Sequence, residues 1–201
     1  MPTNTPQAQK ELESLLLNNL RSIKDYPKKG IMFRDITTIL GNAECFRNLI
    51  DFLRTRYENK GLTHIVGIES RGFVFGSALA YALGIGFVPI RKKGKLPCKT
   101  YKQDYALEYG SDTLEIHIDA FCLKPSLDSN LQEHNIAKSI STNPPLILLV
   151  DDLLATGGTA NASINLIKQA GGKVLESCFL IALKSEFSPK LDSASFALLE
   201  L

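Results

Sequence analysis

Residues 147 to 159 read Ile-Leu-Leu-Val-Asp-Asp-Leu-Leu-Ala-Thr-Gly-Gly-Thr, an apolar run followed by two acidic residues and a glycine-rich turn. A short apolar run with branched side chains is typical of a strand that is buried on both faces, so we predict a strand from Leu146 to Val150. Asp151 and Asp152 would then mark the carboxyl end of this strand. That edge is where open α/β sheets bind their ligands.

The turn after the acidic pair has the features of an anion site. Gly157 and Gly158 allow backbone N–H groups to face an anion, and a helix that begins here would direct its positive end at the same point. Asp151 and Asp152 offer only hydrogen-bond acceptors, which suit the hydroxyls of a ribose or a divalent cation. The stretch therefore indicates a phosphorylated sugar, although an acidic pair can also be a solvated strand end or a helix cap. The sequence contains no Walker loop and no Gly-x-Gly-x-x-Gly motif after a strand.

Strand and helix patterns alternate along the chain at the spacing of βαβ units. An apolar stripe from Leu12 to Ile23 predicts a first helix, which Pro27 and Gly30 close, and Asn42 is a suitable cap for a second helix that stops near Gly61. The later predicted strands are 64–68, 87–90, 146–150 and 174–183, and the later predicted helices are 73–83 and 160–170. We therefore predict an α/β fold with a doubly wound, mainly parallel sheet flanked by helices.

Length and hydrophobic content predict one well-buried domain with an appendage, since the chain has 201 residues of which 44% are hydrophobic. We expect residues 1–40 to form an N-terminal helix and a small hood segment, and residues 41–201 to form the core. Within the core, the polar, Tyr-rich residues 94–119 are predicted to be a flexible active-site loop with two possible hairpin arms. Residues 121–145, rich in Ser, Asn and Pro, are expected to be a surface insertion.

Charge and cysteine content exclude several classes of protein. The net charge is +2, from 23 basic and 21 acidic residues, which gives no global reason to bind nucleic acid or a membrane surface. The four cysteines lie far apart without a Cys-x-x-Cys motif, which favours reduced thiols over a disulfide framework or a zinc site. No apolar run approaches the roughly 20 residues of a membrane span, and the N-terminus lacks a signal-peptide pattern. We expect a soluble, cytoplasmic protein.

Two further segments carry positive charge to the expected ligand edge. In Glu69-Ser-Arg-Gly-Phe73, between a predicted strand and helix, Ser70 leaves a backbone amide available and Arg71 can place two donors on a phosphate. The alternative is that Arg71 only pairs with Glu69. The segment Arg91-Lys-Lys-Gly-Lys95 places four cations at the end of the next predicted strand. Such a run is usually a solvated surface, but its position here favours the binding of pyrophosphate.

A general acid or base and a base-binding segment can also be suggested. Glu108, in Tyr105-Ala-Leu-Glu-Tyr-Gly110, could exchange a proton if a closed loop excluded water, although a lone Glu is more often an exposed surface residue. The segment Gly30 to Asp35, which we expect to be irregular, suits a planar heterocycle, with Phe33 stacking on it and the amides of Met32 to Arg34 reading its edge. Packing of Phe33 in the core is an equal alternative.

Taken together, these motifs resemble the adenine branch of the type I phosphoribosyltransferase family. The resemblance runs in order from about residue 20 to 185 and rests on Tyr26-Pro-Lys-Lys-Gly-Ile-Met-Phe-Arg-Asp-Ile, Glu69-Ser-Arg-Gly-Phe-Val-Phe-Gly, Arg91-Lys-Lys-Gly-Lys-Leu-Pro, Tyr105-Ala-Leu-Glu-Tyr-Gly and Val150-Asp-Asp-Leu-Leu-Ala-Thr-Gly-Gly-Thr. It implies the type I phosphoribosyltransferase fold and the reaction of adenine with phosphoribosyl pyrophosphate to give AMP and pyrophosphate. It also implies a need for magnesium, and a cytoplasmic homodimer that salvages purines.

The resemblance implies a role for each site residue. The 5-phosphate would be held by Ala155, Thr156, Gly157, Gly158 and Thr159, the ribose hydroxyls by Asp151 and Asp152, and the pyrophosphate by Ser70, Arg71, Arg91 and Lys95. Adenine would lie between Phe33 and Leu153, with its edge read by Met32 and Arg34. Glu108 and Arg71 would be catalytic, and Glu108 would exchange a proton with the base near N7, in a loop that also holds Tyr105 and Tyr109. Magnesium would be carried by the substrate near Asp151 and Asp152, without a direct ligand from the protein.

The chain departs from the family pattern at residues 121–145, where the family usually has a short connection. Two other functions stay open: a phosphoribosyltransferase for a 6-oxopurine such as xanthine or hypoxanthine, and a non-catalytic regulator that senses phosphoribosyl pyrophosphate. Met32 to Arg34 favour adenine, and the candidate catalytic residues from Arg91 to Gly110 favour an enzyme.

Overall fold

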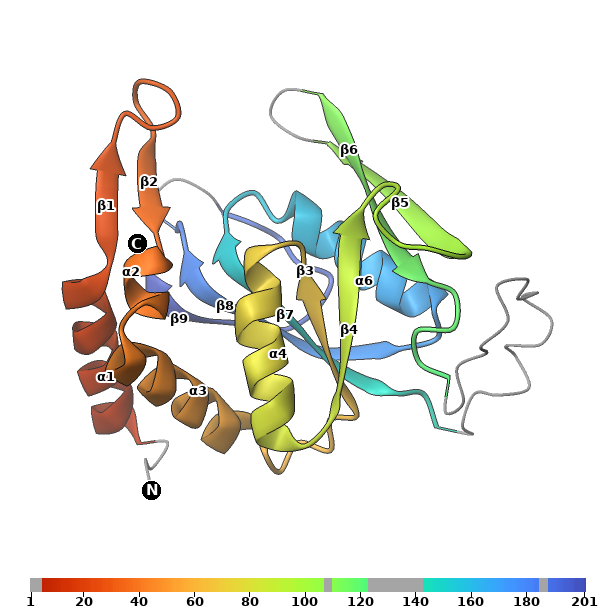
Figure 1. Ribbon diagram of the computed structural model, residues 1–201, viewed down its shortest axis with the longest axis horizontal. Coiled ribbons are helices and arrows are strands. Elements are labelled where there is room, and N and C mark those ends of the chain that lie inside the picture. The colour runs from red at the N-terminus through yellow and green to blue at the C-terminus, as the bar shows by residue number, and fades with distance from the viewer. Residues whose placement is uncertain (1–4, 107–109, 123–142, 185–187) are drawn as a thin grey trace. The chain divides into compact units, whose positions relative to one another are not determined.

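The structure of the protein is a computed structural model that describes residues 5–106, 110–122, 143–184 and 188–201 (Figure 1). The chain divides into two compact units, Met1–Asn59 and Lys60–Leu201. None of the helices in the described ranges has an apolar stretch of the length that crossing a membrane requires.

The N-terminal unit combines three helices with a two-stranded antiparallel sheet. Its elements are α1 (Pro6–Asn19), β1 (Arg21–Lys24), β2 (Met32–Asp35), α2 (Thr37–Leu40) and α3 (Ala43–Tyr57). The predicted cap of α3 is confirmed, because the Asn42 side chain accepts hydrogen bonds from the backbone N–H groups of Glu44 and Cys45. The apolar stripe of α3, which includes Leu49 and Leu53, is buried.

The pairing of β1 with β2 corrects two expectations. The first helix ends at Asn19 rather than near Ile23, and the segment that we expected to be irregular contains β2. Arg21–Lys24 pairs antiparallel with Met32–Asp35, and this partnership between separate segments is not visible in helical periodicity. The unit also extends to Asn59, beyond the expected boundary at residue 40, because α3 packs against α1 and α2.

The C-terminal unit is built on a mainly parallel sheet, as predicted, and this sheet has seven strands (Figure 1). Its strands are β3 (His64–Ile68), β4 (Gly86–Lys92), β5 (Thr100–Ala106), β6 (Ser111–His117), β7 (Leu146–Leu154), β8 (Lys173–Ala182) and β9 (Ser195–Glu200), in the order β5-β6-β4-β3-β7-β8-β9. The five strands β4-β3-β7-β8-β9 are parallel, whereas β6 pairs antiparallel with both β4 and β5.

Helices cover both faces of this sheet, which makes it doubly wound. On one face, α6 (Gly158–Gln169) buries Ile164 and Ile167 in a core that includes Val66 and Leu149 from the strands. On the other face, α4 (Arg71–Leu83) packs on β3 and β7. Residues 65 and 67 face α4 while residues 66 and 68 face α6, as the alternation of side chains along a strand requires.

Two parts of this unit differ from expectation. Most of the predicted loop 94–119 is the antiparallel pair β5 and β6, so the two suggested hairpin arms are present as strands that extend the sheet beyond β4. The edge strand β9 was not predicted. Of the predicted insertion 121–145, residues 123–142 lie outside the described residues.

Candidate active site

The candidate site is a cavity of about 260 Å³ at the carboxyl ends of the parallel strands. It is lined by Glu69, Arg71, Tyr105, Asp151, Asp152, Leu153, Leu154, Ala155, Thr156, Gly157, Thr159, Ala160 and Phe179. The strands β3 and β7 are neighbours, but the chain continues from β3 to β4 on one side of this pair and from β7 to β8 on the other side. The connections that follow β3 and β7 therefore run in opposite directions from this point. Such a switch point is where doubly wound sheets bind ligands.

The acidic pair lies within β7 rather than after it. Pairing with β3 stops at Val150, but β7 continues to pair with β8 through Asp151 and Leu154. One side of this strand is therefore free of β3 at the level of the two carboxylates, while the other side is still held by the sheet. The backbone that carries the pair is consequently fixed on a rigid strand and not on a loop.

Arg71 pairs with Asp152 and not with Glu69. Its Nε lies 3.0 Å from Asp152 Oδ2, and the Asp152 side chain is 5% exposed. The alternative that Arg71 only pairs with Glu69 is therefore wrong. Burial and the neighbouring carboxylate of Asp152 raise the pKa of Asp151 well above its usual value. Burial also raises the pKa of Asp152, while the Arg71 guanidinium opposes part of this rise.

Gly72 permits the close approach of α4 to the acidic pair. A Cβ atom at this position would lie 2.6 Å from the carbonyl oxygen of Val150 and 3.1 Å from Asp151 Oδ1. Only a glycine fits such a contact with backbone. The first turn of α4, which carries Arg71, is thereby brought against the end of β7.

The turn after β7 leads directly into the first turn of α6. Gly157 adopts a left-handed conformation with φ +83° and precedes α6, and within the described residues no side chain caps this helix end and no acidic residue occupies its first turn. The first N–H groups of a helix have no partner inside the helix. The turn therefore presents free donors and the positive end of α6 beside the cavity, as predicted for an anion site.

Glu69 binds the basic segment of residues 91–95, which begins in β4 and continues beyond it. Its carboxylate accepts hydrogen bonds from the Lys92 backbone N–H at 2.8 Å and from Lys95 Nζ, and it lies 3.5 Å from Arg91 Nε. Burial would raise the pKa of Glu69, but the bonds from Lys95 and from the Lys92 backbone outweigh it and lower this pKa. The two cations are thus held at the cavity wall by a carboxylate to which sequence reasoning gave no role of its own.

A second cluster of polar side chains joins β4, β5, β6 and α6. Lys92 Nζ lies 3.0 Å from Asp112 Oδ2, and the hydroxyl of Tyr105 lies 3.5 Å from the same oxygen and also forms a hydrogen bond with Thr159. Burial, followed by the charge of Asp112, raises the pKa of the Tyr105 phenol. The Tyr105 side chain therefore connects the β5–β6 hairpin to the start of α6.

The predicted base-binding segment lies on β2 in the N-terminal unit. Met32 is exposed, and Phe33 is half-buried and contacts the ring of Tyr26 edge-on at 5.2 Å between centroids, so it does not belong to the buried core. Arg34 Nη1 donates a hydrogen bond to Ser22 Oγ at 2.7 Å. Phe33 is therefore accessible to a ligand within this unit.

The structure brings most of the predicted site residues of the C-terminal unit to one cavity. Nine of them line it: Arg71, Tyr105, Asp151, Asp152, Leu153, Ala155, Thr156, Gly157 and Thr159. Gly158 is the first residue of α6, Ser70 precedes α4, and Arg91 and Lys95 reach the site through Glu69. Glu108 and Tyr109 lie outside the described residues.

The lining residues that sequence reasoning missed are Glu69, Leu154, Ala160 and Phe179. The sequence held a signal for Glu69, because Glu69 and Arg91 each directly follow a predicted strand, 64–68 and 87–90. The parallel pairing of Ile68 with Ile90 then places the two residues side by side. Phe179 gave no such signal. It reaches the cavity only because β8 pairs with β7 at Asp151.

Comparison with known proteins identifies the family. A family model described as a phosphoribosyl transferase domain matches residues 35–198. The adenine phosphoribosyltransferase of Helicobacter acinonychis is 53% identical over 173 residues, which are 86% of this chain and 87% of that protein.

Solved structures agree with this comparison. The adenine phosphoribosyltransferase of Saccharomyces cerevisiae, complexed with D-2,5-dideoxy-2,5-imino-altritol 1,6-bisphosphate and adenine, is 35% identical with a TM-score of 0.77 and covers 94% of this chain and 99% of its own. The Trypanosoma brucei adenine phosphoribosyltransferase, in complex with AMP, pyrophosphate and ribose-5-phosphate, is 26% identical with a TM-score of 0.68. This match covers 87% of the present chain and 68% of the Trypanosoma brucei chain. The cavity at the switch point, the family match and these relatives together show that the chain belongs to the adenine phosphoribosyltransferases of the phosphoribosyltransferase family.

Proposed function

We propose that the protein transfers the 5-phosphoribosyl group of phosphoribosyl pyrophosphate to adenine, giving AMP and pyrophosphate, as a step of purine salvage. One observation carries the proposal: a buried carboxylate (Asp152), a half-buried one (Asp151), an arginine and a free helix N-terminus surround one cavity at the switch point of the sheet. The similar proteins from Helicobacter acinonychis and Saccharomyces cerevisiae, both adenine phosphoribosyltransferases, agree with this proposal.

The 5-phosphate is assigned to the turn Ala155–Thr159. Free backbone N–H groups at the start of α6 can donate to its oxygens, and the helix dipole favours its negative charge. Gly157 supports this assignment because its left-handed φ turns the chain into the helix. The hydroxyl of Thr156 or Thr159 can add a further donor.

The ribose hydroxyls are assigned to Asp151 and Asp152. Both carboxylates line the cavity, and hydroxyl groups are donors that carboxylates can accept. Donors that approach Asp151 stabilise its charged form, so binding of the sugar opposes the rise in its pKa that burial causes. The rigid strand beneath the pair keeps the sugar in one orientation.

Magnesium fits this site as an ion carried by the substrate. Within the described residues no group of three or more acidic, His or Cys side chains could hold a metal ion, and Asp151 and Asp152 supply only two carboxylates, one of them paired with Arg71. Magnesium in proteins is commonly held by one or two carboxylates together with substrate phosphates. When bound, it would neutralise charge on the departing pyrophosphate.

The pyrophosphate is assigned to Ser70, Arg71, Arg91 and Lys95. Arg71 faces the cavity, and Glu69 holds Arg91 and Lys95 at its wall. During transfer the bond from the anomeric carbon to the pyrophosphate oxygen breaks, and the bond to N9 of adenine forms. These cations stabilise the charge that develops on the leaving group, which lowers the barrier.

Within the N-terminal unit, Met32, Phe33 and Arg34 on β2 are assigned to adenine. Phe33 offers a ring for stacking, and backbone amides of this strand can read the edge of the base. Glu108 is assigned the proton exchange near N7, which makes the lone pair of N9 available for attack.

A turnover assay with purine bases tests the proposal. Purified protein with phosphoribosyl pyrophosphate and magnesium is expected to form AMP from adenine, and to turn over hypoxanthine and xanthine far more slowly, because a 6-oxopurine reverses the donor and acceptor at positions 6 and 1. Faster turnover of hypoxanthine than of adenine would contradict the proposal. Asp151→Ala combined with Asp152→Ala should abolish binding of ribose 5-phosphate, whereas Asp192→Ala, an exposed carboxylate away from the cavity lining, should not.

The proposal includes a cytoplasmic homodimer. The four cysteines, all within the described residues, form no disulfide with one another, which fits a reducing compartment. Light scattering of the purified protein should give twice the mass of the 22.1 kDa chain. A mass of one chain at micromolar concentration would contradict the dimer.

A further inference from the structure

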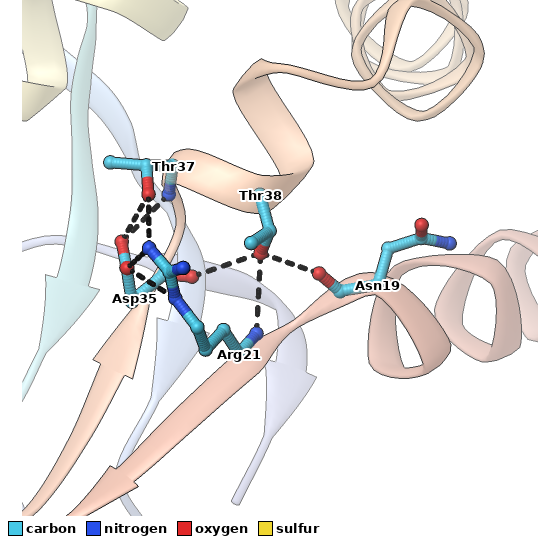
Figure 2. A network of polar contacts seen from close by, with 5 residues as sticks. All are labelled: Asn19, Arg21, Asp35, Thr37 and Thr38. Carbon is cyan, nitrogen blue, oxygen red and sulfur yellow. Dashed lines mark hydrogen bonds and ion pairs between the residues drawn. The ribbon is translucent and has the colours of Figure 1, made fainter.

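Asp35 is the most constrained side chain of the hairpin that carries Phe33. Its Oδ1 accepts hydrogen bonds from the Thr37 backbone N–H at 2.9 Å and from Thr37 Oγ1 at 2.7 Å, while Oδ2 accepts from Arg21 Nε at 2.8 Å and also from Arg21 Nη2. Figure 2 shows the Arg21 guanidinium directed at the Asp35 carboxylate, with the Thr37 hydroxyl beside both groups. Asp35 is 8% exposed, so this carboxylate is buried and fully engaged.

The same network reaches the helices of the N-terminal unit. The Thr38 hydroxyl donates to the carbonyl oxygen of Asn19 at 2.6 Å and accepts the backbone N–H of Arg21 at 3.2 Å (Figure 2). The Asn19 side chain in turn accepts a hydrogen bond from Asn42, the cap of α3, at 3.1 Å. The base of the hairpin is therefore tied to the end of α1 and to the starts of α2 and α3.

The position of this network in the hairpin determines which face Phe33 occupies. Arg21 lies directly opposite Asp35, and Ile23 lies directly opposite Phe33. Since side chains alternate along a strand, these two pairs share one face, while Ser22 and its partner Arg34 share the other. A register slip of one residue would move Phe33 to the opposite face.

The other contacts that hold the hairpin are a hydrogen bond from Arg34 to Ser22 on the opposite face, the edge-on contact of Phe33 with Tyr26, and the bonds of the turn. Only four residue pairs join β1 to β2, and a two-stranded hairpin is marginally stable by itself. The turn is closed by the Asp25 carboxylate, which accepts the Gly30 N–H at 2.7 Å, but this bond lies at the far end from Asp35. The hairpin is thus held at its tip by the turn, between the strands by the Arg34–Ser22 bond, and at its base by the Arg21–Asp35 pair, whose carboxylate is buried.

We infer that Arg21 and Asp35 are positioning residues for the purine base, because their pairing fixes the register of the β1–β2 hairpin and so the face on which Phe33 is presented. The inference rests on the proposed function, in which β2 contacts the base. Neither side chain needs to touch the substrate. Their loss should weaken recognition of the base and leave recognition of the phosphorylated sugar, which belongs to the C-terminal unit, unchanged.

Two ligands separate these effects without turnover. AMP carries the base and the sugar phosphate, whereas ribose 5-phosphate carries only the latter, so calorimetry with both isolates the contribution of the base. Asp35→Asn keeps the shape of the side chain but removes its charge, and Arg21→Lys keeps a charge but loses the forked donor. Both variants should bind AMP about tenfold more weakly and ribose 5-phosphate within twofold of the unchanged protein, because the competent register becomes the minor one.

Steady-state kinetics and a matched control complete the experiment. For both variants KM for adenine should rise about tenfold, while KM for phosphoribosyl pyrophosphate and kcat stay within twofold. Arg54→Ala removes another arginine–carboxylate pair of the same unit, Arg54 with Glu58, which is exposed with 3.7 Å between Nε and Oε2. This control should bind both ligands normally. Circular dichroism verifies that each variant is folded.

The outcomes separate failure of the inference from failure of the proposed function. Unchanged AMP binding in both variants, or an equal loss for AMP and ribose 5-phosphate, would overturn the positioning role. Phe33→Ala is the reference for the base contact: if it leaves AMP binding unchanged, the base assignment of the proposed function is wrong. If the unchanged protein binds neither ligand, the proposed function itself fails.

Discussion

Replacement of Gly72 by alanine tests whether the contact between α4 and β7 holds the site together. The new Cβ would lie 2.6 Å from the backbone carbonyl oxygen of Val150, a distance that real Cβ atoms essentially never show. A shift of about 0.4 Å reaches 3.0 Å, and about 0.8 Å reaches the ordinary contact distance of 3.4 Å. Because both partners are backbone, a side-chain rotation cannot supply this shift.

The shift has a direct effect on the neighbouring ion pair. Arg71 Nε lies 3.0 Å from Asp152 Oδ2, and a displacement of this size along the contact would take the distance to about 3.4–3.8 Å, beyond a good hydrogen bond. Overpacking of this kind costs about 1–3 kcal/mol of unfolding free energy. For a chain of this length, that corresponds to a fall in Tm of about 2–12 °C.

The measurements are thermal unfolding followed by circular dichroism, and calorimetry with ribose 5-phosphate, which the variant should bind more weakly. Gly76→Ala is the matched control on the same helix. Its Cβ would lie 2.9 Å from Cε2 of the Phe87 ring, a side chain that can tilt, and alanine adds about 1 kcal/mol of helix propensity. We expect Gly76→Ala to change Tm little and to leave binding intact. Wild-type Tm and binding in Gly72→Ala would refute the reasoning.

Three further predictions concern the anion turn and the carboxylates. Gly157→Ala should lower the unfolding free energy by about 1–2 kcal/mol, since φ is +83° and a Cβ would lie 3.0 Å from Leu191 Cδ2, and an unchanged denaturation midpoint would argue against this. The hydrogen bonds from Thr37 are the main cause that lowers the pKa of Asp35 to about 2, below the value of 3.8 for an unperturbed Asp. The ionised Asp35 should therefore add up to about 2 kcal/mol to the free energy of unfolding above pH ~4, and this contribution is lost as pH falls toward 2. Urea titrations should show the stability difference between the protein and Asp35→Asn shrinking over that range, and a constant difference would contradict the assignment. Asp151 has a raised pKa in the free protein and should bind the ribose as a carboxylate. Affinity for ribose 5-phosphate should therefore fall as pH is lowered through that pKa, and Asp151→Asn should flatten the pH profile of binding. An equally steep profile in the variant would exclude Asp151 as its source.

The β5–β6 region shows where reasoning from the sequence loses force. The sequence predicts that Tyr105 and Asp112 lie in a loop with two possible hairpin arms, because a polar segment does not show the hydrophobic alternation of a half-buried strand. In the structure they lie on paired strands and share a polar group with Lys92. The pairing of β6 with β4, which adds these two arms to the main sheet, is the part that the local pattern did not indicate.

Local order along the chain was determined by the sequence itself. Strands at His64–Ile68 and from Leu146, the helix capped by Asn42, and the glycine turn before α6 follow from side-chain periodicity, capping and backbone freedom, which act between residues a few positions apart. The family resemblance rested on the same short segments. For these features, neighbouring residues carry the information.

Partnerships between distant residues were decided only by the tertiary structure. Arg71 pairs with Asp152 rather than with Glu69, Glu69 holds Arg91 and Lys95, and the pairing of β1 with β2 sets Arg21 opposite Asp35. Each of these contacts depends on which strands lie side by side and in what register. Strand order and register depend on the packing of the whole unit, because these hydrogen bonds and ion pairs join segments whose local sequence is compatible with several partners.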